Sequence, residues 1–162
     1  MVPPTTPGNP IKGLELEMHP YPHLYIAAAN GRQEGNIALT STDLPEIATA
    51  APPEFDGPGG VWSPETLLCA SIADCFVLSF RAIARASKLE WSELACRVEG
   101  VLERVDGVTQ FTRYTTFATV TVAAESTAET ARRLLDKAEH VCLISNSVRG
   151  DRTLLAEVVI AG

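Results

Sequence analysis

A long apolar stretch in the first half of the chain constrains the fold more than any other feature. It covers residues 66–86, and the charged residues Asp74, Arg81 and Arg85 interrupt it. A helix that spans a membrane needs about 20 predominantly apolar residues, and three charges within this length argue against one. We therefore predict that the stretch forms a helix in the core of a globular domain.

The residues just before this stretch mark where its helix begins. Ser63 suits the N-cap position, and Pro64 suits the first helical position, where an N–H group is not needed. Trp62 can pack against Leu67 as a hydrophobic staple across the first turn. The predicted helix covers residues 64–87.

Before this helix the sequence favours short strands. Apolar and polar residues alternate with a period of two over residues 14–18, and apolar runs at 24–28 and 37–39 are separated by a turn-rich segment. These patterns predict a β-meander. Residues 45–60 contain four prolines, and we predict that they form a loop.

After the helix, the pattern changes to a hairpin, a second helix and a last strand. Alternation from residue 94 onward and the turn pair Asp106-Gly107 predict a long antiparallel hairpin. A capping box at residues 126–129 predicts the start of the second helix. The face of this helix that we expect to be buried comprises Ala131, Leu134, Leu135, Ala138 and Cys142. Residues 154–160 are predicted to form the last strand.

The order of these elements favours one fold class. Strands, a long helix, a hairpin, a helix and a strand follow one another without a glycine-rich phosphate loop, which favours an α+β two-layer fold over a doubly wound sheet. A chain of 162 residues fits one domain. We predict a single domain over residues 1–162, in which the proline-rich residues 1–10 form a flexible tail.

The net charge and the N-terminal residues limit which binding partners and which cellular compartment we expect. The net charge of −7 leaves no excess of Lys and Arg to neutralise phosphates, so neither nucleic acid nor an anionic membrane is an expected partner. The first ten residues lack the basic and apolar regions of a signal peptide, which predicts a cytoplasmic protein. In that reducing compartment the four cysteines are expected to be thiols.

The cysteines are candidates for chemistry, although a helical cysteine is most often a small buried hydrophobe. Cys96 alternates with apolar residues and has no ionisable neighbour on its own strand face, so we assign it to the core. Cys69 and Cys75 are six residues apart, about 240° around a helix, so at most one of them faces a given site. Cys142 lies at a helix end where the dipole disfavours a thiolate, which suits a resolving role.

Cys75 needs help from another part of the chain to react. It lies in mid-helix beside Asp74, so a cation must approach it before its thiolate is stable near neutral pH. The residues alone leave three candidates for that cation open. They are Arg32, in a tight glycine-flanked segment, and Arg81 and Arg85 on the Cys75 helix.

Two cysteine motifs in the chain resemble those of the OsmC/Ohr family. The first comprises residues 62–68 (Trp-Ser-Pro-Glu-Thr-Leu-Leu) and 73–76 (Ala-Asp-Cys-Phe). The second is Ala-Glu-His-Val-Cys-Leu-Ile-Ser-Asn-Ser at residues 138–147. The segment Gly-Arg-Gln-Glu-Gly at 31–35 is similar to the N-terminal Gly-Arg loop of the family. The resemblance covers about residues 24–162.

The resemblance implies a fold, an assembly and a set of roles. Family members are intertwined homodimers in which central helices pack against antiparallel sheets, with two active sites at the interface. By resemblance Cys75 is the peroxidatic cysteine, Cys142 the resolving cysteine, Arg32 the arginine that activates the thiolate, and Glu65 the glutamate that orients this arginine. The chain departs from many peroxidatic members at Leu143, where they have proline.

The implied activity is reduction of organic hydroperoxides, with no metal or organic cofactor. The implied reductant is a dithiol such as a protein-bound lipoyl group. Glu65 and Cys75 are ten residues apart, about 15 Å along a straight helix, so they do not touch. Either an arginine from another segment bridges part of this gap, or the helix kinks. From the residues alone, Glu65 is an acid that interacts favourably with the helix dipole.

Two other functions compete with this interpretation. The chain could be a non-enzymatic binding protein of the same fold, whose cysteines are structural and whose apolar pocket holds a small molecule. A metal site formed by Cys142, His140 and another cysteine is disfavoured, because residues two apart on a helix point to nearly opposite sides. The reactivity of the Cys75 thiol distinguishes the enzyme from the binding protein.

Overall fold

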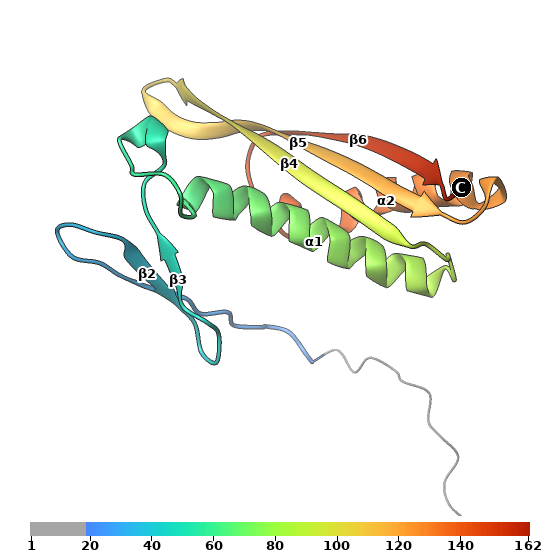
Figure 1. The fold of residues 1–162 in the computed structure, drawn as a ribbon, viewed down its shortest axis with the longest axis horizontal. Coiled ribbons are helices and arrows are strands. Elements are labelled where there is room, and N and C mark those ends of the chain that lie inside the picture. Colours follow the sequence, from blue (N-terminus) through green and yellow to red (C-terminus); the bar gives the residue numbers. More distant parts are fainter. Residues whose placement is uncertain (1–18) are drawn as a thin grey trace, which may run out of the picture.

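Two helices and a long sheet form the body of the protein. The computed structural model describes residues 19–162 and is shown in Figure 1. Helices α1 and α2 lie on one face of a three-stranded sheet, and a second, smaller sheet lies apart from them (Figure 1). The elements of the body are α1 (Pro64–Ala86), β4 (Glu93–Val105), β5 (Val108–Val122), α2 (Ala128–Val141) and β6 (Asp151–Ile160). This arrangement is the predicted α+β class with two layers.

The long sheet has the strand order β4-β5-β6. Strands β4 and β5 are antiparallel, and β6 pairs with β5 in parallel. Asp106 and Gly107 join β4 to β5 with φ angles of 51° and 82°, which a tight two-residue hairpin turn requires. The predicted hairpin is therefore confirmed, and the last strand begins three residues earlier than the predicted residue 154.

Helix α1 begins as the sequence predicts. The Ser63 side chain accepts a hydrogen bond from the Thr66 backbone N–H at 3.2 Å, and the Thr66 hydroxyl oxygen accepts one from the Ser63 N–H at 2.9 Å. This pair forms a capping box, with Pro64 at the first helical position. The helix ends at Ala86 with Ser87 as its C-cap, so both predicted boundaries are confirmed.

One stripe of α1 faces the core. Its buried members recur at every fourth residue, and they are Ile72, Phe76, Phe80 and Ala84. Burying one phenylalanine side chain contributes roughly 1.5–3 kcal/mol. The apolar residues of α2 complete this core, with Leu135 and Ala138 fully shielded from solvent. Contacts of α1 with α2 and β4 therefore hold the middle of α1 in place.

The start of α2 differs from the prediction. A short 3-10 helix, η2 (Glu125–Thr127), precedes α2, and Thr127 is the N-cap without a side-chain cap bond. The Thr127 hydroxyl instead donates to the Ala124 carbonyl at 2.7 Å. The predicted capping box at residues 126–129 is therefore wrong, because the 3-10 turn occupies the residues that would have formed it.

The small sheet contains β1 (Ala28–Asn30), β2 (Ile37–Thr40) and β3 (Ile47–Thr49), all antiparallel. Of the apolar residues 24–28, only the last, Ala28, belongs to a strand of this sheet. Residues 45–60 contain β3 and the 3-10 helix η1 (Pro53–Phe55), so the predicted loop is wrong over these parts. The alternating residues 14–18 and the predicted tail 1–10 lie outside the described residues.

Much apolar surface remains open on the single chain. Helix α1 is long and apolar enough to cross a membrane by length and composition, and 22% of its most apolar window is buried. A core helix has the same composition, and α1 packs on α2 and β4 through its buried stripe. Leu78 on α1 is 48% exposed, and Tyr25 before β1 is 87% exposed. The prediction of a core helix therefore holds for one side of α1.

Candidate active site

Two cysteines that are far apart in the sequence meet between the two helices. Cys75 lies in the middle of α1, and Cys142 is the C-cap of α2. The Cys75 side chain is close enough to the Cys142 thiol to raise its pKa. The Cys142 sulfur also lies 3.9 Å from the carbonyl oxygen of Ile72, one turn before Cys75 on α1. Both are free thiols, so packing of α2 on α1 creates a dithiol pair.

Burial controls the protonation of Cys142, whose side chain is completely shielded from solvent. Loss of hydration raises the pKa of the Cys142 thiol. Hydrogen bonds from Ser145 lower the pKa, and the neighbouring Cys75 raises it again. Because the net change is upward, Cys142 is a neutral thiol at neutral pH. This state suits a second reactant better than a first nucleophile.

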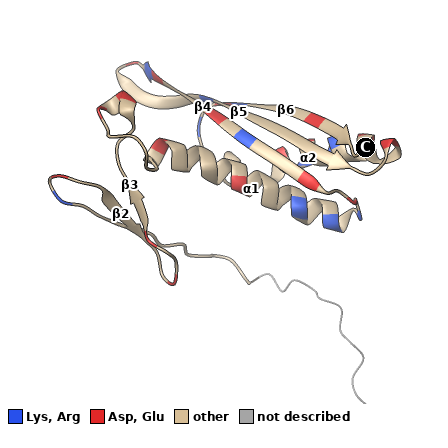
Figure 2. Cartoon of the chain, in the orientation of Figure 1, with Lys and Arg blue, Asp and Glu red and all other residues tan. Residues whose placement is uncertain are grey.

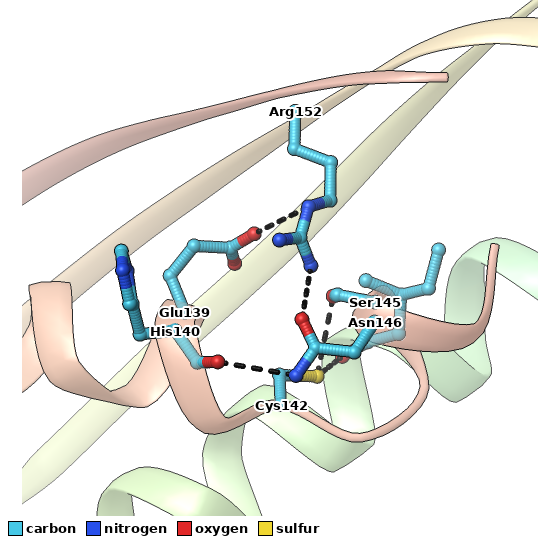
Figure 3. Close-up of polar contacts among 7 residues, drawn as sticks. Glu139, His140, Cys142, Ser145, Asn146 and Arg152 are labelled. Atoms are coloured by element: carbon cyan, nitrogen blue, oxygen red, sulfur yellow. Dashed lines mark hydrogen bonds and ion pairs between the residues drawn. The ribbon is translucent and has the colours of Figure 1, made fainter. Parts of the chain in front are cut away.

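A network of polar contacts fixes the loop that follows Cys142 (Figure 3). The Asn146 side-chain amide donates to the His140 carbonyl at 3.1 Å. Arg152, at the start of β6, donates to the Asn146 side-chain oxygen at 2.9 Å. The Arg152 guanidinium also lies 3.8 Å from the Glu139 carboxylate. The loop is therefore tied both to the end of α2 and to the beginning of β6.

Glu139 is an unusual member of this network because one carboxylate oxygen is buried without a hydrogen-bond partner among the described residues. Burial raises the pKa of Glu139, and the nearby charges of Arg152 and His140 partly oppose this change. No local sequence pattern singles out this group, because it is buried where α2 packs against β6.

The remaining cysteines lie on the sheet-facing side of α1 and on β4. Burial raises the pKa of Cys96 to about 11, and the nearby Cys142 and Glu139 add to the increase. Both neighbours come from the end of α2 and not from the strand that carries Cys96, so the expectation of no ionisable neighbour on its own strand face is not contradicted. Burial also raises the pKa of Cys69, which a hydrogen bond from the Gly100 backbone partly offsets. Neither thiol is poised to react.

Glu65 and Arg32 do not reach Cys75 within one chain. Helix α1 is uninterrupted from Pro64 to Ala86, so the kink that could shorten the distance from Glu65 is absent and about 15 Å remains. One carboxylate oxygen of Glu65 is buried without a hydrogen-bond partner among residues 19–162. Arg32 lies in the exposed turn between β1 and β2, away from the body.

The other two arginine candidates lie further along α1, six and ten residues after Cys75. Arg81 and Arg85 are exposed on the last turns of α1. Figure 2 shows basic residues at this end of the helix and an acidic residue at its beginning. Over residues 19–162, one chain thus brings Cys75 and Cys142 together. Its three candidate arginines lie at exposed positions in other parts of the structure.

A cavity of about 530 Å³ opens between α1 and β4. Its walls are mainly apolar, and Glu65 lies in them beside Cys69. The residues that give it bulk are Phe55, Trp62, Leu102 and Phe111. The cavity is large enough for a small apolar group. Among residues 19–162 no three His, Cys, Asp or Glu side chains are grouped so as to hold a metal ion.

The fold agrees with the family that the sequence matches. Residues 57–154 match the model of the OsmC-like protein family. The chain therefore belongs to the OsmC-like proteins.

Relatives of the chain extend this result. The uncharacterised protein YmaD of Bacillus subtilis is 25% identical over 141 residues, which cover 85% of this chain and 94% of YmaD. An OsmC-like protein of unknown function from Vibrio cholerae has the same fold, with a TM-score of 0.76 at 17% identity over 83% of this chain and 99% of that one. An organic hydroperoxide resistance protein from Legionella pneumophila is 28% identical, with a TM-score of 0.67 over 85% of this chain and 98% of that one.

Proposed function

We propose that this protein is a thiol-dependent peroxidase that reduces organic hydroperoxides. The observation that carries the proposal is the proximity of Cys75 on α1 and Cys142 at the end of α2, which are 67 positions apart in the sequence. Disulfide formation requires such proximity in a folded protein. The similarity to the Legionella pneumophila organic hydroperoxide resistance protein supports the substrate class.

The proposed reaction uses each thiol once. The Cys75 thiolate attacks the distal oxygen of the hydroperoxide, the O–O bond breaks, and the alkoxide leaves as an alcohol after it takes up a proton. Cys75 is then a sulfenic acid. Cys142 attacks its sulfur, a disulfide forms and water leaves. A dithiol such as a protein-bound lipoyl group reduces the disulfide, and no metal or organic cofactor takes part.

We propose that the active form is a homodimer. The single chain leaves the apolar side of α1 and the residues before β1 exposed, and a surface of this kind on a globular protein marks an interface. The small β1–β3 sheet lies apart from the body (Figure 1), so a second chain can fit against it and against α1. Sedimentation should therefore report the mass of two chains, and a folded, active monomer would contradict the assignment.

The dimer also accounts for the two site residues that do not reach Cys75. Glu65 is about 15 Å from Cys75 along its own helix, but an α1 helix that crosses its antiparallel, twofold-related copy near residue 70 would bring Glu65 near Cys75 of the partner subunit. We propose that Glu65 and Arg32 act in this way across the interface. Arg32 would stabilise the thiolate, and Glu65 would orient the guanidinium.

Mixed dimers test this arrangement. The variant Cys75→Ser should be inactive, because it lacks the reacting thiol. The variant Glu65→Gln should be impaired by at least roughly tenfold, the effect of a rise of one unit in the pKa of the Cys75 thiol. When both chains are expressed together, a mixed dimer contains one site with both native residues. With random pairing, half of the dimers are mixed and each of these has one intact site of two, so about a quarter of the parent turnover should return. If Glu65 acted on its own chain's Cys75, the mixture would show no recovery.

A peroxide-consumption assay tests the activity itself. With dihydrolipoamide as reductant, the protein should consume cumene hydroperoxide at least roughly tenfold more efficiently than hydrogen peroxide. The reason is that the side chains next to Cys75 on α1, among them Ile72, Phe76 and Leu78, are apolar, and apolar surroundings favour a substrate with an apolar group by about 1–3 kcal/mol. Rates of peroxide loss with and without protein measure this preference. Consumption of neither peroxide would overturn the proposed function.

The cavity also supports a second candidate, a non-enzymatic binding protein of the same fold. Its walls are mainly apolar, and the cysteines in them, Cys69 and Cys96, have raised pKa values. In that case Cys75 should be unreactive toward peroxides at neutral pH, while an apolar molecule should bind. The same assay distinguishes the two functions.

A further inference from the structure

The hydroxyl of Ser145 contacts the sulfur of Cys142 in a buried position. Its oxygen lies 3.2 Å from the sulfur and donates the hydrogen bond (Figure 3). Ser145 is 2% exposed and Cys142 is fully buried, so water does not replace this donor. The thiol of Cys142 can in turn donate to the Ile72 carbonyl at 3.9 Å. The Ser145 hydroxyl, together with the Ser145 backbone N–H, thus remains as a donor when the sulfur loses its own proton.

We propose that Ser145 stabilises the Cys142 thiolate when it attacks the oxidised sulfur of Cys75, and so sets the rate of disulfide formation. The inference rests on the proposed function of the dithiol pair. A hydroxyl donor bonds more strongly to a thiolate than to a thiol or a disulfide sulfur. The interaction therefore favours the attacking state over the states before and after it.

Among residues 19–162, the groups that lower the pKa of Cys142 both belong to Ser145, its hydroxyl and its backbone N–H. The ionisable neighbours are Cys75 on α1 and Cys96 on β4, and each becomes negative when it ionises. Arg152 from β6 is engaged by Glu139 and Asn146. Burial alone would leave Cys142 a poor nucleophile at neutral pH, because a thiol must lose its proton to react.

The step balances without a further reactant. The Cys142 thiolate forms a bond to the Cys75 sulfur, and the S–O bond of the sulfenic acid breaks. Hydroxide leaves and combines with the proton that Cys142 released, which gives water. The Cys142 sulfur is oxidised, and the Cys75 sulfur is reduced by the same amount.

The neighbouring Ser147 provides a matched control. Its hydroxyl donates to the Leu143 carbonyl at 2.7 Å, within the same short loop. It does not contact the Cys142 sulfur, and it is exposed. Replacing Ser147 with alanine removes a hydroxyl and a loop hydrogen bond of the same kind, so it measures the structural part of any effect.

The test uses the disulfide reagent DTNB, which requires no peroxide. In a background with Cys69→Ala and Cys96→Ala, Cys75 should attack DTNB, release one thionitrobenzoate and carry the other as a mixed disulfide. Cys142 then attacks Cys75 and releases the second thionitrobenzoate, which is followed by absorbance. The rate of this second phase, measured against pH, reports the reactivity of Cys142.

We expect Ser145→Ala to slow the second phase roughly tenfold at neutral pH and to raise its pH midpoint by about one unit. The first phase should not change, and Ser147→Ala should leave both phases as in the parent. Ser145→Thr keeps the hydroxyl and should keep the parent midpoint. An unchanged second phase in Ser145→Ala, an equal loss in Ser147→Ala, or no second phase in the parent would overturn the inference.

This result is separable from the proposed function. A protein that resolves the mixed disulfide through Ser145 but consumes no hydroperoxide would refute the peroxidase and retain the role of Ser145. A protein that consumes hydroperoxide, with Ser145→Ala showing the parent's second phase, would retain the peroxidase and refute the role of Ser145.

Discussion

Replacing Cys75 with serine should abolish peroxide reduction and leave the folded protein intact. The change removes the thiolate, and a serine hydroxyl stays protonated at neutral pH and does not attack the O–O bond. It removes little volume from a half-buried position, so the core is preserved. We expect turnover of cumene hydroperoxide to fall at least about a thousandfold, as is typical when a nucleophile is removed. Peroxide consumption measures the loss of turnover, and circular dichroism measures whether the variant is folded.

The other two cysteines of the helix and sheet are the controls. Cys69→Ser and Cys96→Ser should retain turnover close to the parent, because burial keeps both thiols protonated. Normal activity in Cys75→Ser, or a large loss in Cys69→Ser with a normal fold, would show that a different thiol is the nucleophile.

Replacing Cys142 with serine should permit one rapid reaction with peroxide and then stop turnover. The first attack uses Cys75 alone, so its rate should stay near that of the parent. The sulfenic acid then has no internal thiol placed to condense with it, because Cys142 is the neighbour of Cys75. Cys75 should remain a sulfenic acid or oxidise further to a sulfinic acid.

Mass spectrometry after one equivalent of cumene hydroperoxide measures this stalled state. The Cys142→Ser protein should carry one or two added oxygens on the peptide that contains Cys75. Steady-state turnover with a dithiol should be lost or strongly reduced. Sustained turnover at the parent rate would mean that the external dithiol resolves Cys75 directly and that Cys142 is not required.

The parts of the fold that could be predicted are those with strong local signals. Ser63 and Pro64 fix the start of α1, and Asp106-Gly107 fixes the hairpin, because caps and tight turns depend on a few adjacent residues. Strand β3 could not be predicted, because its hydrogen bonds come from pairing with β2 and its own residues are proline-flanked. The start of α2 was placed wrongly because a 3-10 turn competes with the capping box at the same residues.

The candidate site also has residues that the sequence predicts and contacts that it does not. The residues alone singled out Cys75 and Cys142 as separate candidates, and only the family resemblance joined them. Their proximity arises from the packing of α2 on α1, which no local pattern encodes. The contact of Ser145 with the Cys142 sulfur is local, between residues three apart in the chain, whereas Cys96 comes near Cys142 from β4. Glu65 could not be placed from one helix, since it lies about 15 Å from Cys75 along α1 and joins the site only in the proposed dimer.

Mapping of the disulfide in the parent protein tests the central claim most directly. The reduced protein is mixed with one equivalent of cumene hydroperoxide, alkylated and digested, and its peptides are identified by mass. The account predicts a Cys75–Cys142 linked peptide, with Cys69 and Cys96 alkylated, and one equivalent of cumyl alcohol. An unmodified Cys75, or a disulfide that omits either Cys75 or Cys142, would contradict the two-cysteine peroxidase.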